Sequence, residues 1–290
     1  MRDPLSARIP FWTIAPAALA ATASILAIFL FLREPPPGAE AGGAETGAER
    51  RPMTVFRFVD PDEIVHRSRL QFTFDPPEAL RDLRSEEALD ELIAGAGTDL
   101  ERFRRVMEWA RRQFDPGVPD PYPPLDARII LRDIRSGFTG GFCAQYNYVL
   151  AQALMSLGYP ARYVTVVDHE VIEAWLRDEG RWLCLDPLHA ATYVDETGRP
   201  LSVLDVSERL RNGGSVIPGP GSLPGTAAAA AHAFEQFQVW VRNDHVSNPI
   251  NFSDIARYKV RFLRDGEAWS PQDGMATTSA EDLYAPPPGG

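Results

Sequence analysis

Residues 140–187 read GGFCAQYNYVLAQALMSLGYPARYVTVVDHEVIEAWLRDEGRWLCLDP. Apolar residues recur at helical spacing over Phe142–Leu157, and Gly158 is a natural C-cap, so we expect a helix that ends there. The residues that follow favour three strands, at Pro160–Val167, Val171–Trp175 and Arg181–Leu185. A helix packed on an antiparallel sheet is therefore the predicted core.

Cys143 stands at the start of the predicted helix, directly after Gly140 and Gly141. The glycines permit a tight turn into the helix, and the first N–H groups of a helix have no partner within it. Those groups and the helix dipole favour a thiolate and can face a developing oxyanion. The dipole contributes only about 0.3–1 kcal/mol, so an activated thiol also needs a cationic partner such as a protonated histidine.

A histidine and a carboxylate follow on the two later strands. If residues 177–180 form a four-residue loop, counting back along both strands places Asp186 opposite Val171. His169, two residues before Val171, then shares a face with Asp186. A loop of odd length would break this register. A carboxylate that holds an imidazole, with the imidazole serving a thiol, is the arrangement of a nucleophilic triad.

These motifs together resemble the transglutaminase-like superfamily over roughly Asp99–Pro187. The resemblance rests on Gly-Gly-Phe-Cys143, on Leu157-Gly-Tyr-Pro-Ala-Arg-Tyr-Val164, on His169 with Glu173, and on Trp182…Leu185-Asp186-Pro187. It implies a papain-like α+β fold with Cys143 as nucleophile, His169 as base and acid, and Asp186 as the group that orients the histidine. Val171 stands where many members carry an aromatic residue, and no upstream side chain is identified for the oxyanion hole.

The order of the other elements also favours an α+β fold. Amphipathic helices are expected at Pro77–Ala94 and Asp99–Phe114, before the strands. A capped helix is expected at Ser202–Leu210, and late strands at Phe237–Val241 and Tyr258–Leu263. Helices that precede strands are typical of α+β rather than alternating α/β proteins.

The termini differ in composition from this domain. We expect a short N-terminal segment at 1–10, a transmembrane anchor at 11–32, and a flexible linker rich in Pro, Gly, Ala and Glu at 33–52. The transglutaminase-like domain is expected at 53–269, with its motif core at 99–187. Residues 270–290 have few core-forming side chains and are predicted to be a disordered tail.

The run from Phe11 to Leu32 contains no charged residue. About 20 apolar residues span a bilayer core, whereas the apolar region of a signal peptide has only about 7–15, so an uncleaved single-pass anchor is preferred to a cleaved signal. Arg2 and Arg8 favour a cytoplasmic N-terminus, which would place the catalytic domain outside the cytoplasm.

Composition narrows the classes of partner. The formal net charge of -11 argues against nucleic acid or anionic lipid surfaces as main partners. Two cysteines make no disulfide framework, and both are predicted to be free thiols. Cys184 shares strand parity with Asp186 and is interpreted as a buried strand thiol. No cofactor is expected, and the expected substrate is a protein or peptide.

Other polar residues near the motifs have two readings. Glu173 either touches substrate or is a hydrogen-bonded structural carboxylate, and Gln145 and Tyr146 either line the cleft or occupy ordinary helix positions. No metal site is predicted, because the spacing of the later histidines does not match metal ligands. These histidines are His189, His232 and His245.

The sequence therefore predicts a membrane-anchored thiol enzyme acting on amide bonds through an acyl-enzyme. Attack by Cys143 on a peptide or glutamine carboxamide can end in hydrolysis or in transfer to an amine, and the sequence favours neither outcome. The alternative is a transglutaminase-like domain without catalysis, serving as a scaffold or binding module in an envelope assembly.

Overall fold

The computed structural model describes residues 70–269 and 274–288 of the chain. Contacts divide the chain after Met53 into two units, and every described residue belongs to the second. The segments predicted at 1–10, 11–32 and 33–52, including the anchor, lie outside the described residues. Within the described part, no helix combines the length and apolar character needed to cross a bilayer.

Helices occupy the first part of the described chain. They are α2 (Arg81–Glu86), α3 (Leu89–Ile93), α4 (Asp99–Arg111), α5 (Ala127–Arg135) and α6 (Cys143–Ser156). The helix predicted at Pro77–Ala94 is broken in two, because Ala88 adopts a left-handed conformation with φ of 49°. Helix α4 begins after Thr98, whose hydroxyl accepts a hydrogen bond from the Glu101 N–H at 3.2 Å.

The strands form a large, mainly antiparallel sheet in the order β10-β9-β7-β2-β3-β4-β5-β6. Their bounds are β2 (Ala161–Val166), β3 (His169–Leu176), β4 (Arg181–Asp186), β5 (Ala191–Val194), β6 (Ile217–Pro218), β7 (Phe237–Trp240), β9 (Lys259–Phe262) and β10 (Met275–Thr277). A separate two-stranded sheet pairs β1 (Thr73–Phe74) with β8 (Arg242–Asn243). The mixed α+β class expected from the sequence is confirmed.

The register of the β3–β4 hairpin is the one that the loop length predicts. Leu176 pairs with Arg181 across the four-residue loop, and the ladder continues to Ile172 opposite Leu185. Asp186, one residue further along β4, pairs in turn with Ala191 of β5. His169 and Asp186 are thereby brought to the same end of the two strands.

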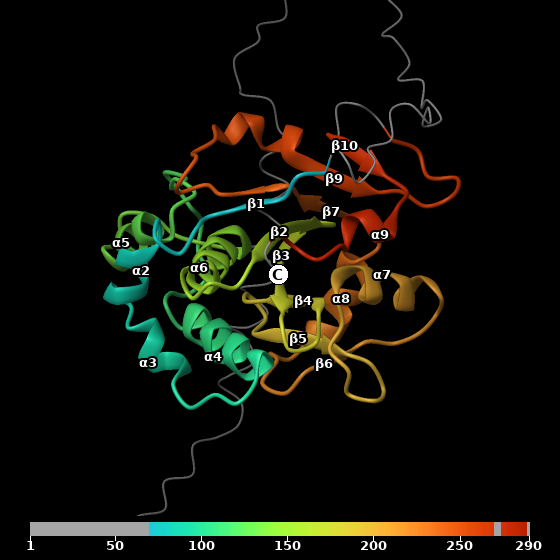
Figure 1. The fold of residues 1–290 in the computed structure, drawn as a ribbon, viewed down its shortest axis with the longest axis horizontal. Coiled ribbons are helices and arrows are strands. Elements are labelled where there is room, and N and C mark those ends of the chain that lie inside the picture. The colour runs from blue at the N-terminus through green and yellow to red at the C-terminus, as the bar shows by residue number, and fades with distance from the viewer. Residues whose placement is uncertain (1–69, 270–273, 289–290) are drawn as a thin grey trace, which may run out of the picture. The chain divides into compact units, whose positions relative to one another are not determined.

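Helices cover both faces of the sheet (Figure 1), with α4, α5 and α6 on one side and α7 (Val203–Arg211) and α8 (Thr226–Ala233) on the other. Ile172 and Leu185 belong to the core cluster beneath α4 and α6, whereas their neighbours Val171 and Cys184 belong to the cluster beneath α7 and α8. Every residue of α6 is buried, which explains why its sequence contains no charged residue. Cys143 therefore begins the central helix of the domain.

The C-terminal segment differs from the expected disordered tail. Residues 274–288 contain β10 and the helix α9 (Ala280–Leu283), and Leu283 is fully buried. The Arg162 guanidinium donates to the Leu283 carbonyl at 2.7 Å, and the Trp182 indole donates to the Ala285 carbonyl at 3.2 Å. The segment is ordered because side chains from the central sheet bind its backbone.

Candidate active site

Gly140, three residues before Cys143, is required by a close approach between two backbones. The Gly117 N–H donates to the Gly141 carbonyl at 2.7 Å, and the Gly140 N–H donates to the Val118 carbonyl at 3.1 Å. A Cβ on Gly140 would lie 2.3 Å from that Val118 oxygen. The sequence indicated that the glycines permit a tight turn. In the structure Gly140 lets the proline-rich loop at 116–124 pack beside the start of α6, and a Cβ on Gly141 would lie 2.6 Å from Cδ1 of Ile134.

The first turn of α6 is held by its own side chains. Gln145 accepts a hydrogen bond from the Phe142 N–H at 3.0 Å through Oε1. The Tyr146 hydroxyl donates to the Phe114 carbonyl, and its ring stacks on Phe114 with centroids 4.1 Å apart. Burial raises the pKa of Tyr146 to about 12, so its hydroxyl keeps its proton at neutral pH. Both side chains therefore position the helix start.

His169 and Asp186 meet as the sequence predicts. His169 is the first residue of β3 and Asp186 the last of β4, and the imidazole Nε2 donates to Asp186 Oδ2 at 3.0 Å. The side chain of His169 is 12% exposed and that of Asp186 is 1% exposed. The Cys143 thiol interacts with the same imidazole. The three residues singled out in the sequence are thus neighbours in space.

Electrostatics favour the charged forms of this pair. Burial by itself would lower the pKa of His169, but the Asp186 carboxylate, with a smaller contribution from Cys143, raises it well above the ordinary value of 6.5. Burial would raise the pKa of Asp186, yet the charge and hydrogen bond of His169, assisted by His189, hold that pKa far below its usual range. An imidazolium facing a carboxylate is the state that these directions describe.

Two further residues bind the Asp186 carboxylate, and the sequence pattern did not predict this contact for either of them. The His189 Nδ1–H donates to Asp186 Oδ2 at 2.8 Å, and the His189 backbone N–H donates to Oδ1 at 3.2 Å. The Tyr193 hydroxyl donates to Oδ2 at 3.1 Å. Strand parity could have identified Tyr193, which lies two residues beyond Ala191, the register partner of Asp186.

The same cluster contains side chains of the types that bind transition metals. Three possible ligand atoms lie within 4.8 Å of one another, one from each of His169, Asp186 and His189. The sequence predicted no metal site here, because the spacing of the later histidines does not match metal ligands. Both imidazoles already donate to Asp186 Oδ2, at 3.0 and 2.8 Å. These hydrogen bonds account for the closeness of the three groups without an ion.

Glu173 is a structural carboxylate. It forms an ion pair of 2.7 Å with Arg162, directly opposite on β2, and both side chains are fully buried. Its other oxygen accepts from the Val203 N–H at 2.7 Å and from the Tyr284 hydroxyl at 3.1 Å. With every lone-pair direction engaged by the protein, Glu173 is closed to substrate.

The remaining candidates are not among the groups that donate hydrogen bonds to Asp186. Cys184 is a fully buried free thiol, and burial raises its pKa well above the ordinary value. His245 is buried against Tyr163, and burial lowers its pKa to about 4. His232 has a 65% exposed side chain whose nearest carboxylates, from Asp168 and Glu235, are 4.0 Å away.

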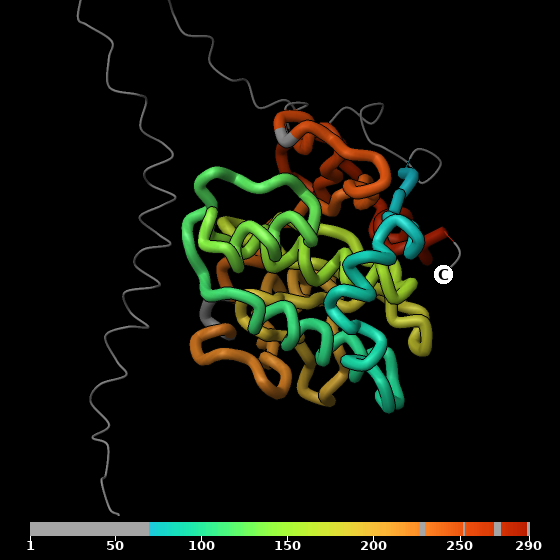
Figure 2. The backbone as a smooth tube through the Cα atoms, turned by 90° about the vertical axis from the view of Figure 1, so that its left-hand side faces the viewer, coloured from blue at the N-terminus to red at the C-terminus, as the bar shows by residue number. Residues whose placement is uncertain are grey.

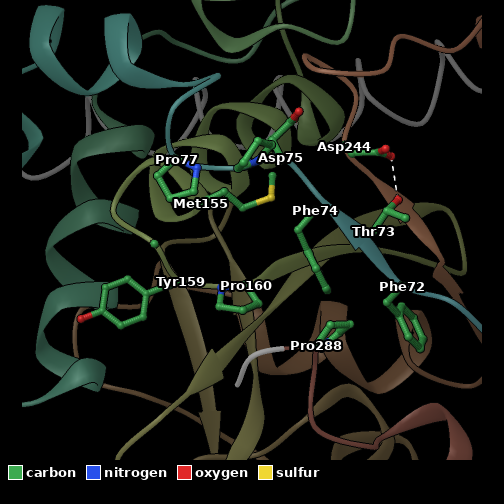
Figure 3. A pocket seen from close by; sticks show the side chains of 12 residues that line it. Phe72, Thr73, Phe74, Asp75, Pro77, Met155, Tyr159, Pro160, Asp244 and Pro288 are labelled. Carbon is green, nitrogen blue, oxygen red and sulfur yellow. Dashed lines mark hydrogen bonds between the residues drawn. The ribbon is translucent and has the colours of Figure 1, made fainter.

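A pocket of about 500 Å³ lies toward the other end of α6, at Met155, and is lined by aromatic and proline side chains (Figure 3). Its two acidic residues are bound within the protein. Asp244 accepts from the Thr73 hydroxyl at 2.7 Å, and Asp75 accepts from the Ser247 N–H at 2.7 Å. This pocket offers no reactive group comparable to Cys143.

Comparison with known families identifies the class of the domain. The model of the transglutaminase-like superfamily matches residues 86–187, which run from the end of α2 to the residue after Asp186. Those residues are therefore a transglutaminase-like superfamily domain, a class in which cysteine-dependent action on amide bonds is common. No curated protein is significantly similar to the chain.

Proposed function

We propose that the domain is a thiol enzyme that acts on peptide or glutamine amide bonds. In this proposal the Cys143 thiolate attacks the carbonyl carbon, and the C–N bond breaks as the His169 imidazolium gives its proton to the leaving amine. The resulting thioester is then attacked by water or by a second amine, whose proton His169 accepts. Hydrolysis regenerates the thiol with a carboxylic acid, and aminolysis regenerates it with a new amide.

The observation that carries the proposal is the hydrogen bond of 3.0 Å between His169 and Asp186, with Cys143 interacting with the same ring. Because Nε2 faces the carboxylate, the other ring nitrogen, Nδ1, is the atom available to the thiol. A buried carboxylate in this position stabilises the imidazolium that must form when the thiol gives up its proton. The N–H groups of the first turn of α6 are suitably placed to receive an oxyanion.

Selective alkylation tests this assignment, because the chain carries its own control. Iodoacetamide should modify Cys143 rapidly near neutral pH, while fully buried Cys184 should react slowly. His169→Ala should slow the modification of Cys143 and leave Cys184 unchanged. Peptide mass spectrometry after timed quenching measures both rates. Equal rates at the two cysteines in the unaltered protein, with no effect of His169→Ala, would overturn the proposal.

One observation favours the non-catalytic alternative. Cys143 is only 6% exposed, so a substrate carbonyl has little access to the thiol in this conformation. A scaffold that keeps the fold without the reaction has no need for an accessible thiol. Alkylation separates the two functions, since a scaffold has no need for a thiol more reactive than Cys184.

We further propose that the domain is held at a membrane by residues 11–32 and faces away from the cytoplasm. The support is the uncharged run from Phe11 to Leu32, bounded by Arg8 and Arg33. The full-length chain should sediment with membranes and keep its N-terminus, and protease added to spheroplasts should digest the domain. A mature chain that begins near Gly42 would show a cleaved signal instead.

A further inference from the structure

Large apolar side chains left exposed in the described part of the chain lie in or next to two segments. The first segment is residues 116–124, with Val118 at 53% and Tyr122 at 38%, and the second is residues 212–225, with Ile217 at 44% and Leu223 at 39%. Phe138, at 63%, lies next to the first segment, because its neighbour Thr139 is hydrogen-bonded to Pro121. Single exposed apolar residues are normal on a protein surface and are usually scattered. Their restriction to these two places calls for a physical reason.

The first segment is fixed to the backbone that leads into Cys143. Besides the pairing of residues 117–118 with residues 140–141, the Thr139 hydroxyl donates to the Pro121 carbonyl at 2.7 Å. The Tyr122 ring meets the Phe142 ring edge-on, with centroids 6.3 Å apart. The apolar side chains of this segment therefore stand beside the start of α6.

The second segment is fixed to the strands that hold Asp186. The Leu223 N–H donates to the His189 carbonyl at 2.9 Å, and the Gly219 N–H donates to the Thr192 carbonyl at 2.7 Å. Ile217 pairs with Val194 of β5. The apolar side chains of this segment therefore stand on the histidine and aspartate side of the candidate site.

Arg111 links residues that lie next to the two segments, because Phe114 lies two residues before Pro116 and Leu188 precedes His189, whose carbonyl binds Leu223. Its guanidinium donates to the Leu188 carbonyl at 3.1 Å, and to the Phe114 carbonyl at 3.5 Å. Figure 2 shows the loop that follows α4, in bright green, and the segment before α8, in orange, along the same margin of the domain. The two segments thus flank the residues of the candidate site from opposite sides.

From this arrangement we infer that the two segments are the lips of a substrate cleft that binds an extended polypeptide with apolar side chains on both sides of the reactive amide. This inference rests on the proposed function. A small amide would contact only one lip, whereas an extended chain crosses both. Residues 212–225 contain no charged side chain, and Asp120 is the single charge in residues 116–124, so both lips suit apolar side chains.

The sequence of the lips adds to this fit. Prolines are frequent in both, at Pro116, Pro119, Pro121, Pro123 and Pro124 in one and at Pro218, Pro220 and Pro224 in the other. Proline limits the freedom of the unbound backbone, so less conformational entropy is lost when a ligand binds. The lips are therefore suited to bind without first becoming ordered.

Peptide binding to the full-length Cys143→Ala variant tests the inference without requiring any reaction. Two fluorescent peptides of equal length share a central glutamine; one has Leu, Val and Phe on both sides, and the other has Ser and Thr. Fluorescence anisotropy should show at least about tenfold tighter binding of the apolar peptide. Val118→Ser and Leu223→Ser should each weaken that binding several-fold, while Arg112→Ser, at the exposed C-cap of α4, should not change it.

Equal affinity for the two peptides, or unchanged affinity in both lip variants, would overturn the inference. Neutral phosphatidylcholine vesicles serve as the competing occupant. Co-sedimentation of the full-length protein with vesicles that both lip variants weaken, in the absence of peptide binding, would also overturn the inference. Selective peptide binding together with an unreactive Cys143 would keep the cleft and reject the thiol enzyme. The two proposals therefore fail by different results.

Discussion

Two buried carboxylates on neighbouring strands have opposite surroundings. Glu173 on β3 faces the guanidinium of Arg162, and neither side chain is exposed. Asp186 on β4 faces the imidazoles of His169 and His189, whose side chains are 12% and 26% exposed. An arginine stays protonated in proteins, whereas an imidazole changes charge near neutral pH.

The difference separates a group that maintains the fold from one that is suited to chemistry. The groups around Glu173 do not change their protonation, because they are a permanent cation, a backbone N–H and a tyrosine hydroxyl. Around Asp186 two of the partners are imidazoles, which can gain and lose protons, and both of them reach solvent. Burial of a carboxylate is thus no guide to its role unless the nature of its partners is known.

The largest expected effect is on turnover. Asp186→Asn should lower kcat by about 10⁴-fold, because an amide cannot stabilise the imidazolium of His169. A fluorogenic peptide or amine-incorporation assay with the apolar peptide measures the loss, and circular dichroism checks that the variant is folded. A variant that retains turnover within a few-fold of the unaltered protein would contradict the contrast drawn between the two carboxylates.

Of the two carboxylates, Glu173 with its partner Arg162 should have the larger effect on stability. Glu173→Gln leaves the buried Arg162 charge unpaired and should lower the free energy of unfolding by about 3–5 kcal/mol. The double variant Arg162→Met, Glu173→Leu removes both charges and should recover most of this loss. Urea unfolding monitored by tryptophan fluorescence measures all three proteins. A double variant less stable than Glu173→Gln would show that the ion pair itself stabilises the fold.

The dependence of stability on pH should reveal the His169–Asp186 pair. The raised pKa of His169 means that the pair contributes fully below about pH 6.5 and that its contribution is lost as the pH rises toward the raised value. In the Cys143→Ala background, which removes the proton of the thiol from the count, the free energy of unfolding should fall by up to about 1.4 kcal/mol per pH unit above 6.5.

Asp186→Asn in the same background should abolish most of that slope, because the amide carries no charge to hold the proton on His169. The lowered pKa of Asp186 gives the complementary expectation at acid pH. Its contribution is present above about pH 3.8 and is lost as the pH falls below that value. Identical pH profiles with aspartate and asparagine at position 186 would exclude the ion pair.

The smallest effects come from the two tyrosines that donate to these carboxylates. Tyr193→Phe and Tyr284→Phe each remove one hydrogen bond and should each cost about 1 kcal/mol of stability. Only Tyr193→Phe should shift the pH profile of Cys143 alkylation, because Tyr193 acts on Asp186 whereas Tyr284 acts on Glu173. Equal shifts in both variants would show that the two sites are coupled.

Local patterns in the sequence were sufficient to predict those features of the structure that depend on nearby residues. The length of the 177–180 loop predicted the pairing of Leu176 with Arg181, and through it the meeting of His169 with Asp186. The apolar run before Gly158 likewise predicted α6. Alternation along a strand and the length of a hairpin loop are constraints that act within about 20 residues.

Other features depend on contacts that no local pattern records. Helix α5 was not predicted, although Asp126 caps it by accepting from the Arg128 N–H at 2.8 Å, a signal that the sequence contained. The break at Ala88 requires a left-handed backbone conformation, which the presence of an alanine does not predict. The order of residues 274–288 comes from partners more than 100 positions away, such as Arg162 for the Leu283 carbonyl.

The docking of α9 also affects the time at which the domain can fold during its synthesis. Arg162 leaves the ribosome 121 residues ahead of Leu283, the residue whose carbonyl it binds. Until the C-terminal segment follows, a guanidinium at the centre of the sheet lacks one acceptor and the cover of the Tyr284 ring. The nascent domain therefore completes its core only after residues 280–284 have been synthesised. A chain that stops before Ala280 is expected to be recognised as incomplete by proteases.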